Sequence, residues 1–97
     1  MAKGYWIARV DVDDLDLYQQ YIAANAAPFA QYGARFLVRA GEFECVEGTS
    51  RSRNVVIEFP SYEDAKACYA SEAYQHAKSL RAPVATSDLV IVQGYDA

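Results

Sequence analysis

The sequence contains few of the side chains that build metal sites and nucleophilic active sites. Among 97 residues there are one histidine, His76, and two cysteines, Cys45 and Cys68. The cysteines lack the CxxC spacing of a zinc or redox site, and a lone histidine cannot complete the ligand set of a metal. We therefore expect no metal and no cofactor, and we expect both thiols to be free.

Positive charge and long hydrophobic runs are scarce as well. Nine lysines and arginines stand against 13 aspartates and glutamates, which gives a net charge of −4. Binding to nucleic-acid phosphates needs clustered cations, so we expect no nucleic-acid partner. No apolar run is long enough to cross a bilayer, and the residues after Met1 do not have the pattern of a signal peptide. These features predict a cytoplasmic protein without a membrane partner.

Large apolar side chains, in contrast, are plentiful. Hydrophobic residues make up 53% of the chain, and there are eight tyrosines and four phenylalanines. A chain of this length forms one domain, here residues 1–97, and buries only about two-thirds of the surface that it exposes when unfolded. The surplus of aromatic surface suggests that a partner subunit covers part of it.

Strand and helix patterns alternate along the chain. Runs of β-branched and aromatic residues predict strands at 5–11, 34–39, 54–59 and 88–93. Helical spacing and a capping Asp or Ser predict helices from about 15 to 32, from 62 to 70 and from 72 to about 80, with a kink or restart at Pro28. Gly41 is expected to introduce a β-bulge. The order βαββαβ favours an α+β, ferredoxin-like fold: a four-stranded antiparallel sheet with its helices on one face.

Alternation along each strand divides the residues between two faces of that sheet. The face expected under the helices is wholly apolar: Trp6, Ala8, Val10, Phe36, Val38, Val55, Ile57, Phe59, Val90 and Val92. The open face mixes apolar and polar residues: Tyr5, Ile7, Arg9, Arg35, Leu37, Arg39, Val56, Glu58, Leu89, Ile91, Gln93 and Tyr95. Such an apolar open face predicts a homodimer in which two sheets pack together about a two-fold axis.

The polar residues of the open face are the candidate functional residues. The first and third strands should be neighbours, so Arg9 and Glu58 could form an ion pair that fixes the dimer geometry. Alternatively, Arg39 or Arg9 holds a small anion in a pocket where Glu58 acts as acceptor or base. Glu58 and Arg39 are then the candidate catalytic residues. The candidate ligand-binding residues are Arg9, Tyr32, Tyr74, His76 and Gln93.

Four segments of the chain resemble a known family: residues 4–11, 36–41, 55–61 with the following 69–74, and 88–94. They are similar to the small bacterial family catalogued as domain of unknown function 1330, and the most specific element is the run Val-Ile-Glu-Phe-Pro-Ser at 56–61. The resemblance covers nearly the whole chain and implies a ferredoxin-like dimeric α/β barrel. It implies no reaction, because the family is uncharacterised.

Two functions remain open at this point. The first is a homodimer that binds a small molecule between the sheet and the helices of each subunit. If it is an enzyme, it would be a cofactor-free oxygenase or an isomerase acting on a small aromatic or carboxylate metabolite, with Glu58 as base and the arginines holding the developing anion. The second is a non-catalytic binding or structural module, in which the same residues only lock the dimer.

Overall fold

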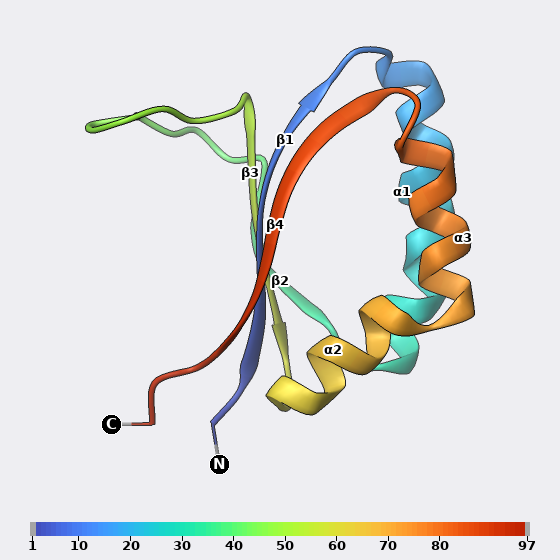
Figure 1. Ribbon diagram of the computed structural model, residues 1–97, viewed down its shortest axis with the longest axis vertical. Helices are drawn as coiled ribbons and strands as arrows, with labels where there is room; N and C mark the ends of the chain where they lie inside the picture. The colour runs from blue at the N-terminus through green and yellow to red at the C-terminus, as the bar shows by residue number, and fades with distance from the viewer. Residues whose placement is uncertain (1, 97) are drawn as a thin grey trace.

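The chain folds into one antiparallel sheet with helices on one side (Figure 1). The computed structural model describes residues 2–96. The elements are β1 (Gly4–Val12), α1 (Leu15–Gln31), β2 (Arg35–Arg39), β3 (Arg53–Phe59), α2 (Tyr62–Ala70), α3 (Glu72–Arg81) and β4 (Ala85–Gln93). The strands lie in the order β2-β3-β1-β4, with β1 and β3 at the centre. This is the ferredoxin-like α+β fold that the sequence predicted.

The helices begin and end largely where the sequence signals lie. Asp14 caps α1 by accepting the Leu17 amide at 3.1 Å, and the helix runs to Gln31 without restarting at Pro28. Proline removes a single backbone hydrogen bond, which the packed helix tolerates here. Gly33 follows α1 with a φ of +73°, the left-handed conformation typical of a helix C-terminus. No helix within residues 2–96 is both long enough and apolar enough to cross a membrane.

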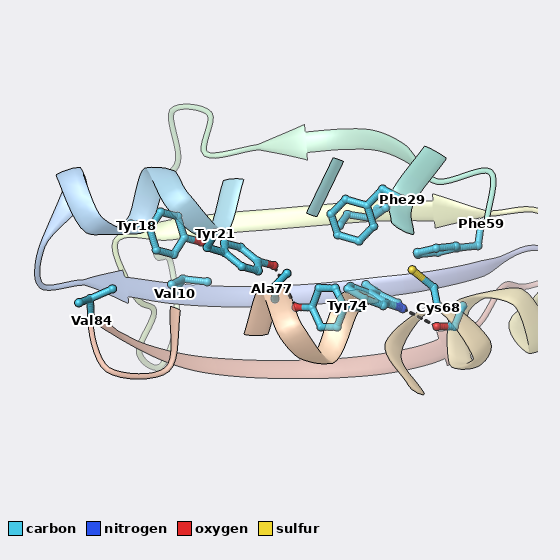
Figure 2. Packing of buried hydrophobic residues seen from close by; sticks show 13 residues of the cluster. Val10, Tyr18, Tyr21, Phe29, Phe59, Cys68, Tyr74, Ala77 and Val84 are labelled. Atoms are coloured by element: carbon cyan, nitrogen blue, oxygen red, sulfur yellow. Dashed lines mark hydrogen bonds between the residues drawn. The ribbon is translucent and has the colours of Figure 1, made fainter. Parts of the chain in front are cut away.

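The core lies between the sheet and the helices and is centred on Trp6. Figure 2 shows Phe29, Phe59 and Tyr74 gathered in this layer. The Trp6 ring centroid lies 4.8 Å from that of Tyr74, 5.2 Å from that of Phe59 and 5.3 Å from that of Phe29. The indole Nε1 of Trp6 donates to the carbonyl oxygen of Ala65 at 2.8 Å. This bond ties β1 to α2 and satisfies the one polar atom that the indole brings into the core.

The faces of β4 are the reverse of the prediction. The antiparallel register places Ile91 opposite the buried Trp6, so both side chains lie under the helices. Leu89 also packs against the core, whereas Val90 and Val92 are 58% and 41% exposed on the open face. The run of apolar residues in this strand has no alternation from which a face can be read. The register of β4 with β1 decides instead which of its side chains lie under the helices.

The bulge in β2 lies earlier than predicted. The register with β3 shifts between Phe36 and Val38, so Leu37 is the extra residue, and no bulge forms at Gly41. A bulge reverses the faces of every residue that follows it. Val38 therefore lies on the open face and Arg39 on the helix side, opposite to the prediction for both.

The segment between β2 and β3 projects from the side of the sheet that faces away from the helices (Figure 1). Residues 41–50 are all exposed. They include two large apolar side chains without cover in the single chain, Phe43 at 47% and Val46 at 78% exposure. We call this segment, residues 40–52, the projecting loop.

Candidate functional site

The structure separates the two residues that were expected to form an ion pair. In the β1–β3 register, Arg9 lies opposite Asn54 and Glu58 lies opposite Tyr5. Arg9 and Glu58 are therefore about 13 Å apart along the strands, since each residue advances about 3.3 Å. Glu58 instead accepts a hydrogen bond from the Tyr5 hydroxyl at 3.2 Å. The predicted Arg9–Glu58 ion pair is wrong, because strand adjacency alone does not fix the register.

Arg39 lies on the opposite side of the sheet from Glu58 and Arg9. Its guanidinium carbon lies 4.2 Å from the centroid of the Phe36 ring, and its side chain lines a cavity between the sheet and the helices. The bulge at Leu37 is the cause. The proposed cooperation of Arg39 and Glu58 at one site within a subunit is therefore not possible.

The remaining candidate residues are dispersed. Tyr32 is half-buried against the core at the end of α1, and Tyr74 is completely buried. His76 is exposed on α3, and Gln93 is exposed at the end of β4 opposite Gly4. Of the seven candidates, Arg39 is the one found among the residues that line the internal cavity within residues 2–96.

That internal cavity has a volume of about 40 Å³ and lies between the sheet and α1. Aromatic and aliphatic side chains form most of its wall, among them Trp6, Phe29 and Phe36. Polar side chains converge on it as well: Arg39, Arg53, Arg81, Asn25 and Ser87. An apolar wall with a few converging polar groups is the usual composition of a small-molecule site.

The sequence did not identify Arg53 and Arg81 as candidate site residues, because each lies one residue outside the predicted bounds of its strand or helix. Arg53 was assigned to the loop but is the first residue of β3, opposite the buried Val10. Arg81 lies one residue beyond the predicted end of its helix and is the last residue of α3. Extending the alternation of Val55 and Ile57 back by one step would have placed Arg53 under the helices.

The tyrosines around the cavity remain protonated. Burial raises the pKa of both Tyr18 and Tyr21 above its usual value. The hydroxyls of Tyr21 and Tyr74 are joined by a hydrogen bond of 2.9 Å (Figure 2). For Arg81, burial opposes the charged form, but Tyr74 and Tyr21 favour it, and its pKa lies above the usual value. The site therefore combines neutral phenols with charged guanidinium groups.

A polar cluster of different character lies at the base of the projecting loop. Arg51 donates from Nη1 to Asp11 at 2.9 Å and from Nε to Asp88 at 2.8 Å. The Ser52 amide donates to the other Asp11 oxygen at 2.9 Å. Arg9 lines the shallow depression beside them. Because Arg51 is matched by two carboxylates, this cluster anchors the loop to β1 and β4 rather than offering free charge.

The Asp11 carboxylate should make stability depend on pH. The Ser52 amide and then Arg51 lower its pKa below the usual 3.8. A lowered folded-state pKa adds stability above the unfolded value, and this stability is lost as the pH falls through the folded pKa. Asp11→Asn should therefore lower the melting temperature at neutral pH, and the difference from wild type should shrink in acid.

Thermal unfolding followed by circular dichroism at neutral and acidic pH measures this effect. Asp13→Asn is the matched control, because the ion pairs within residues 2–96 do not involve Asp13. A difference between Asp11→Asn and wild type that is the same at both pH values would contradict the anchoring role.

Solved structures share this fold at low sequence identity. A protein of unknown function from Rhodopseudomonas palustris is 16% identical with a TM-score of 0.76, and the match covers 99% of this chain and 85% of that one. A cofactor-independent oxygenase from Streptomyces nogalater is 13% identical with a TM-score of 0.65, covering 100% and 97%. A dimeric ferredoxin-like protein of unknown function from Thermobifida fusca is 20% identical with a TM-score of 0.60, covering 95% and 89%. At these identities the likeness establishes the fold alone.

The sequence comparison identifies the family. Among curated proteins, none matches this chain. A family model described as a domain of unknown function, DUF1330, matches residues 3–95, as the four segments of the sequence predicted. With nearly the whole chain matched, the protein belongs to the DUF1330 family.

Proposed function

We propose that this protein is a homodimer in which each subunit binds a small molecule in the cavity between the sheet and the helices. The observation that carries the proposal is the convergence of three arginines on a cavity whose wall is mostly apolar. Arginine side chains normally point to solvent, and a core that served stability alone would not enclose Arg81 and the Nε atom of Arg53 with Arg39 beside them. Groups that fix the orientation of a ligand would be arranged in this way.

The open face of the sheet supports the dimer. Its middle is apolar, with Ile7 38%, Val38 40% and Val90 58% exposed. Both signs of charge flank this band, with Arg35 opposite Glu58 at one end and Arg9 opposite Asp88 at the other. A two-fold axis through such a face can bring opposite charges of two copies together. We call these residues, with Val56 and Val92, the open-face patch.

The projecting loop supports the same arrangement. It leaves the sheet on the side of the open-face patch (Figure 1). A second copy packed on that patch would lie next to Phe43 and Val46, whose apolar side chains are otherwise exposed to water. Solved relatives with this fold are described as dimeric, which favours a second copy of this chain as the partner.

Binding without catalysis is the function that the cavity favours. Within residues 2–96, no aspartate, glutamate or histidine lines the cavity. Burial also keeps Tyr18 and Tyr21 protonated, so the cavity offers no general base with a pKa near neutral pH. Glu58, the predicted base, lies on the other face of the sheet.

A cofactor-free oxygenase or isomerase is the second candidate. One solved protein with this fold is a cofactor-independent oxygenase. In this chain such a reaction would depend on a substrate acidic enough to ionise without an enzymatic base, and the arginines would stabilise its anion. Oxygen consumption and the chemical identity of each bound ligand after incubation, followed by NMR, separate the two candidates, because a binding module consumes no oxygen and leaves its ligand unchanged.

A fragment screen by amide NMR tests the proposed cavity. We expect bound fragments to shift the amides of Val10, Tyr18 and Arg53. Ala8→Leu should abolish these shifts, since Ala8 lines the cavity and is 8% exposed. Ala73→Leu makes the same substitution on the exposed surface of α3 and should leave the shifts intact. Fragment shifts that persist in well-folded Ala8→Leu would overturn the cavity as the site.

A further inference from the structure

The three cavity arginines come from three different elements and differ in exposure. Arg39 ends β2 and is exposed, Arg53 begins β3 and is half-buried, and Arg81 ends α3 and is 8% exposed. The positive charge therefore extends from the surface at Arg39 to the interior at Arg81. An anionic ligand that enters the cavity would therefore be attracted by positive charge along its whole path.

Among residues 2–96, no aspartate or glutamate forms an ion pair with these three arginines. Within residues 2–96, the ion pairs join Arg51 to Asp11 and Asp88, away from the cavity. Within the described part of the chain, Arg81 donates to two neutral oxygens, Ser87 Oγ and the Tyr74 hydroxyl, both at a long 3.4 Å. The Nε atom of Arg53 is buried and finds no hydrogen-bond partner among the residues described. A buried guanidinium without a counter-charge is costly, and the cost is removed when an anion binds.

Aromatic rings hold these guanidinium groups in place without neutralising them. The guanidinium carbon lies 5.5 Å from the Tyr18 ring centroid in Arg53 and 5.5 Å from the Tyr21 centroid in Arg81. Both distances fall within the range of cation–π attraction. Because the two phenols stay neutral, the net positive charge remains available to a ligand.

We propose that the ligand of this cavity is a small organic carboxylate. Its carboxylate lies between Arg53 and Arg81, where guanidinium groups can donate two parallel hydrogen bonds. A cavity of about 40 Å³ has room for this head group. The apolar part of the ligand lies along Phe36 toward the exposed Arg39. This inference names the ligand class of the proposed cavity and rests on that proposal.

Isosteric pairs of probes separate charge from shape. Propionate and benzoate should bind at least about tenfold more tightly than propionamide and benzamide, measured by amide NMR and by the fluorescence of Trp6, the single tryptophan. Equal affinity of acids and amides would overturn the carboxylate inference but leave the cavity proposal standing. Binding of neither pair would overturn both. Inorganic phosphate binding as tightly as benzoate would overturn the organic part of the inference.

Arg53→Met tests the residue whose Nε lacks a partner. We expect carboxylate affinity to fall at least about tenfold, while the ligand-free variant unfolds at the same or a higher temperature because a buried charge is gone. A lower melting temperature with unchanged affinity would show a structural role and overturn the assignment. Arg81→Met provides the same readout if Arg53→Met does not fold.

Arg51→Met is the matched control. Arg51 lies two residues before Arg53 and pairs with Asp11 and Asp88 at the base of the projecting loop. The same substitution there should leave carboxylate affinity unchanged. An equal loss of affinity in both variants would show that general positive charge, rather than the cavity, attracts the anion.

Discussion

Ile7→Asp should convert the proposed dimer into a monomer. Ile7 lies in the middle of the open-face patch on the central strand β1, between Val56 of β3 and Val90 of β4. A two-fold interface contains the substitution twice, and each carboxylate would lose its water without gaining a partner. We expect the dissociation constant of the dimer to rise by about 100-fold or more, since such losses exceed about 2.7 kcal/mol.

Sedimentation velocity over a range of concentrations measures this change. Ala73→Asp is the matched control, because it adds the same charge to the exposed surface of α3 on the helix side and should not alter the dimer. Val90→Asp, at the neighbouring position on the patch, should act like Ile7→Asp. A wild-type protein that is monomeric, or an Ile7→Asp variant that dimerises as tightly as wild type, would refute the open-face interface.

Trp6→Ala should be the most destabilising change in the core. Trp6 is 1% exposed, its ring packs on those of Tyr74 and Phe29, and its Nε1 is bonded to the Ala65 carbonyl. Removing a buried tryptophan costs about 3–5 kcal/mol in lost packing and cavity formation. That is a large part of the total stability of a small domain, about 5–15 kcal/mol.

Urea unfolding of purified variants measures this loss. Trp6→Phe should cost less, because an aromatic ring remains and the Ala65 carbonyl, which lies within α2, loses only the bond from the indole, a loss of about 0.5–1.5 kcal/mol. Tyr95→Ala is the exposed control, since Tyr95 is 93% exposed, and should change stability by less than about 0.5 kcal/mol. A loss below about 1.5 kcal/mol for Trp6→Ala would contradict the central position of this side chain.

The sequence determined the fold because its local signals agree with one another. Asp14, Ser61 and Ser71 cap the helices, in agreement with the predicted capping by an Asp or a Ser, and Gly33 follows α1. The alternation of Trp6, Ala8 and Val10 identifies the buried face of β1. Such signals need only the nearest neighbours along the chain, and the order βαββαβ then leaves few arrangements that bury all the apolar faces.

The site could not be predicted in the same way, since it depends on which face of the sheet each strand residue occupies and on the residues at which strands and helices begin and end. The bulge at Leu37 places Arg39 at the cavity, whereas the sequence predicted it on the open face. The strand β3 begins at Arg53, one residue earlier than predicted, and this places Arg53 at the cavity as well. The ligand site stays a prediction, and of the two arginines assigned to it from the sequence, Arg39 lies at the cavity between the sheet and the helices. Arg9 and Glu58 stay on the opposite face.

The sequence by itself determined the elements, their order, the family and the presence of apolar side chains on both faces of the sheet. Tertiary structure alone decided which face β4 presents, where the bulge lies and which arginines meet. The physical reason is that side-chain direction alternates with every residue of a strand. A shift of a single residue, set by pairing with a distant strand, therefore leaves the fold unchanged but moves a charged group from one side of the sheet to the other.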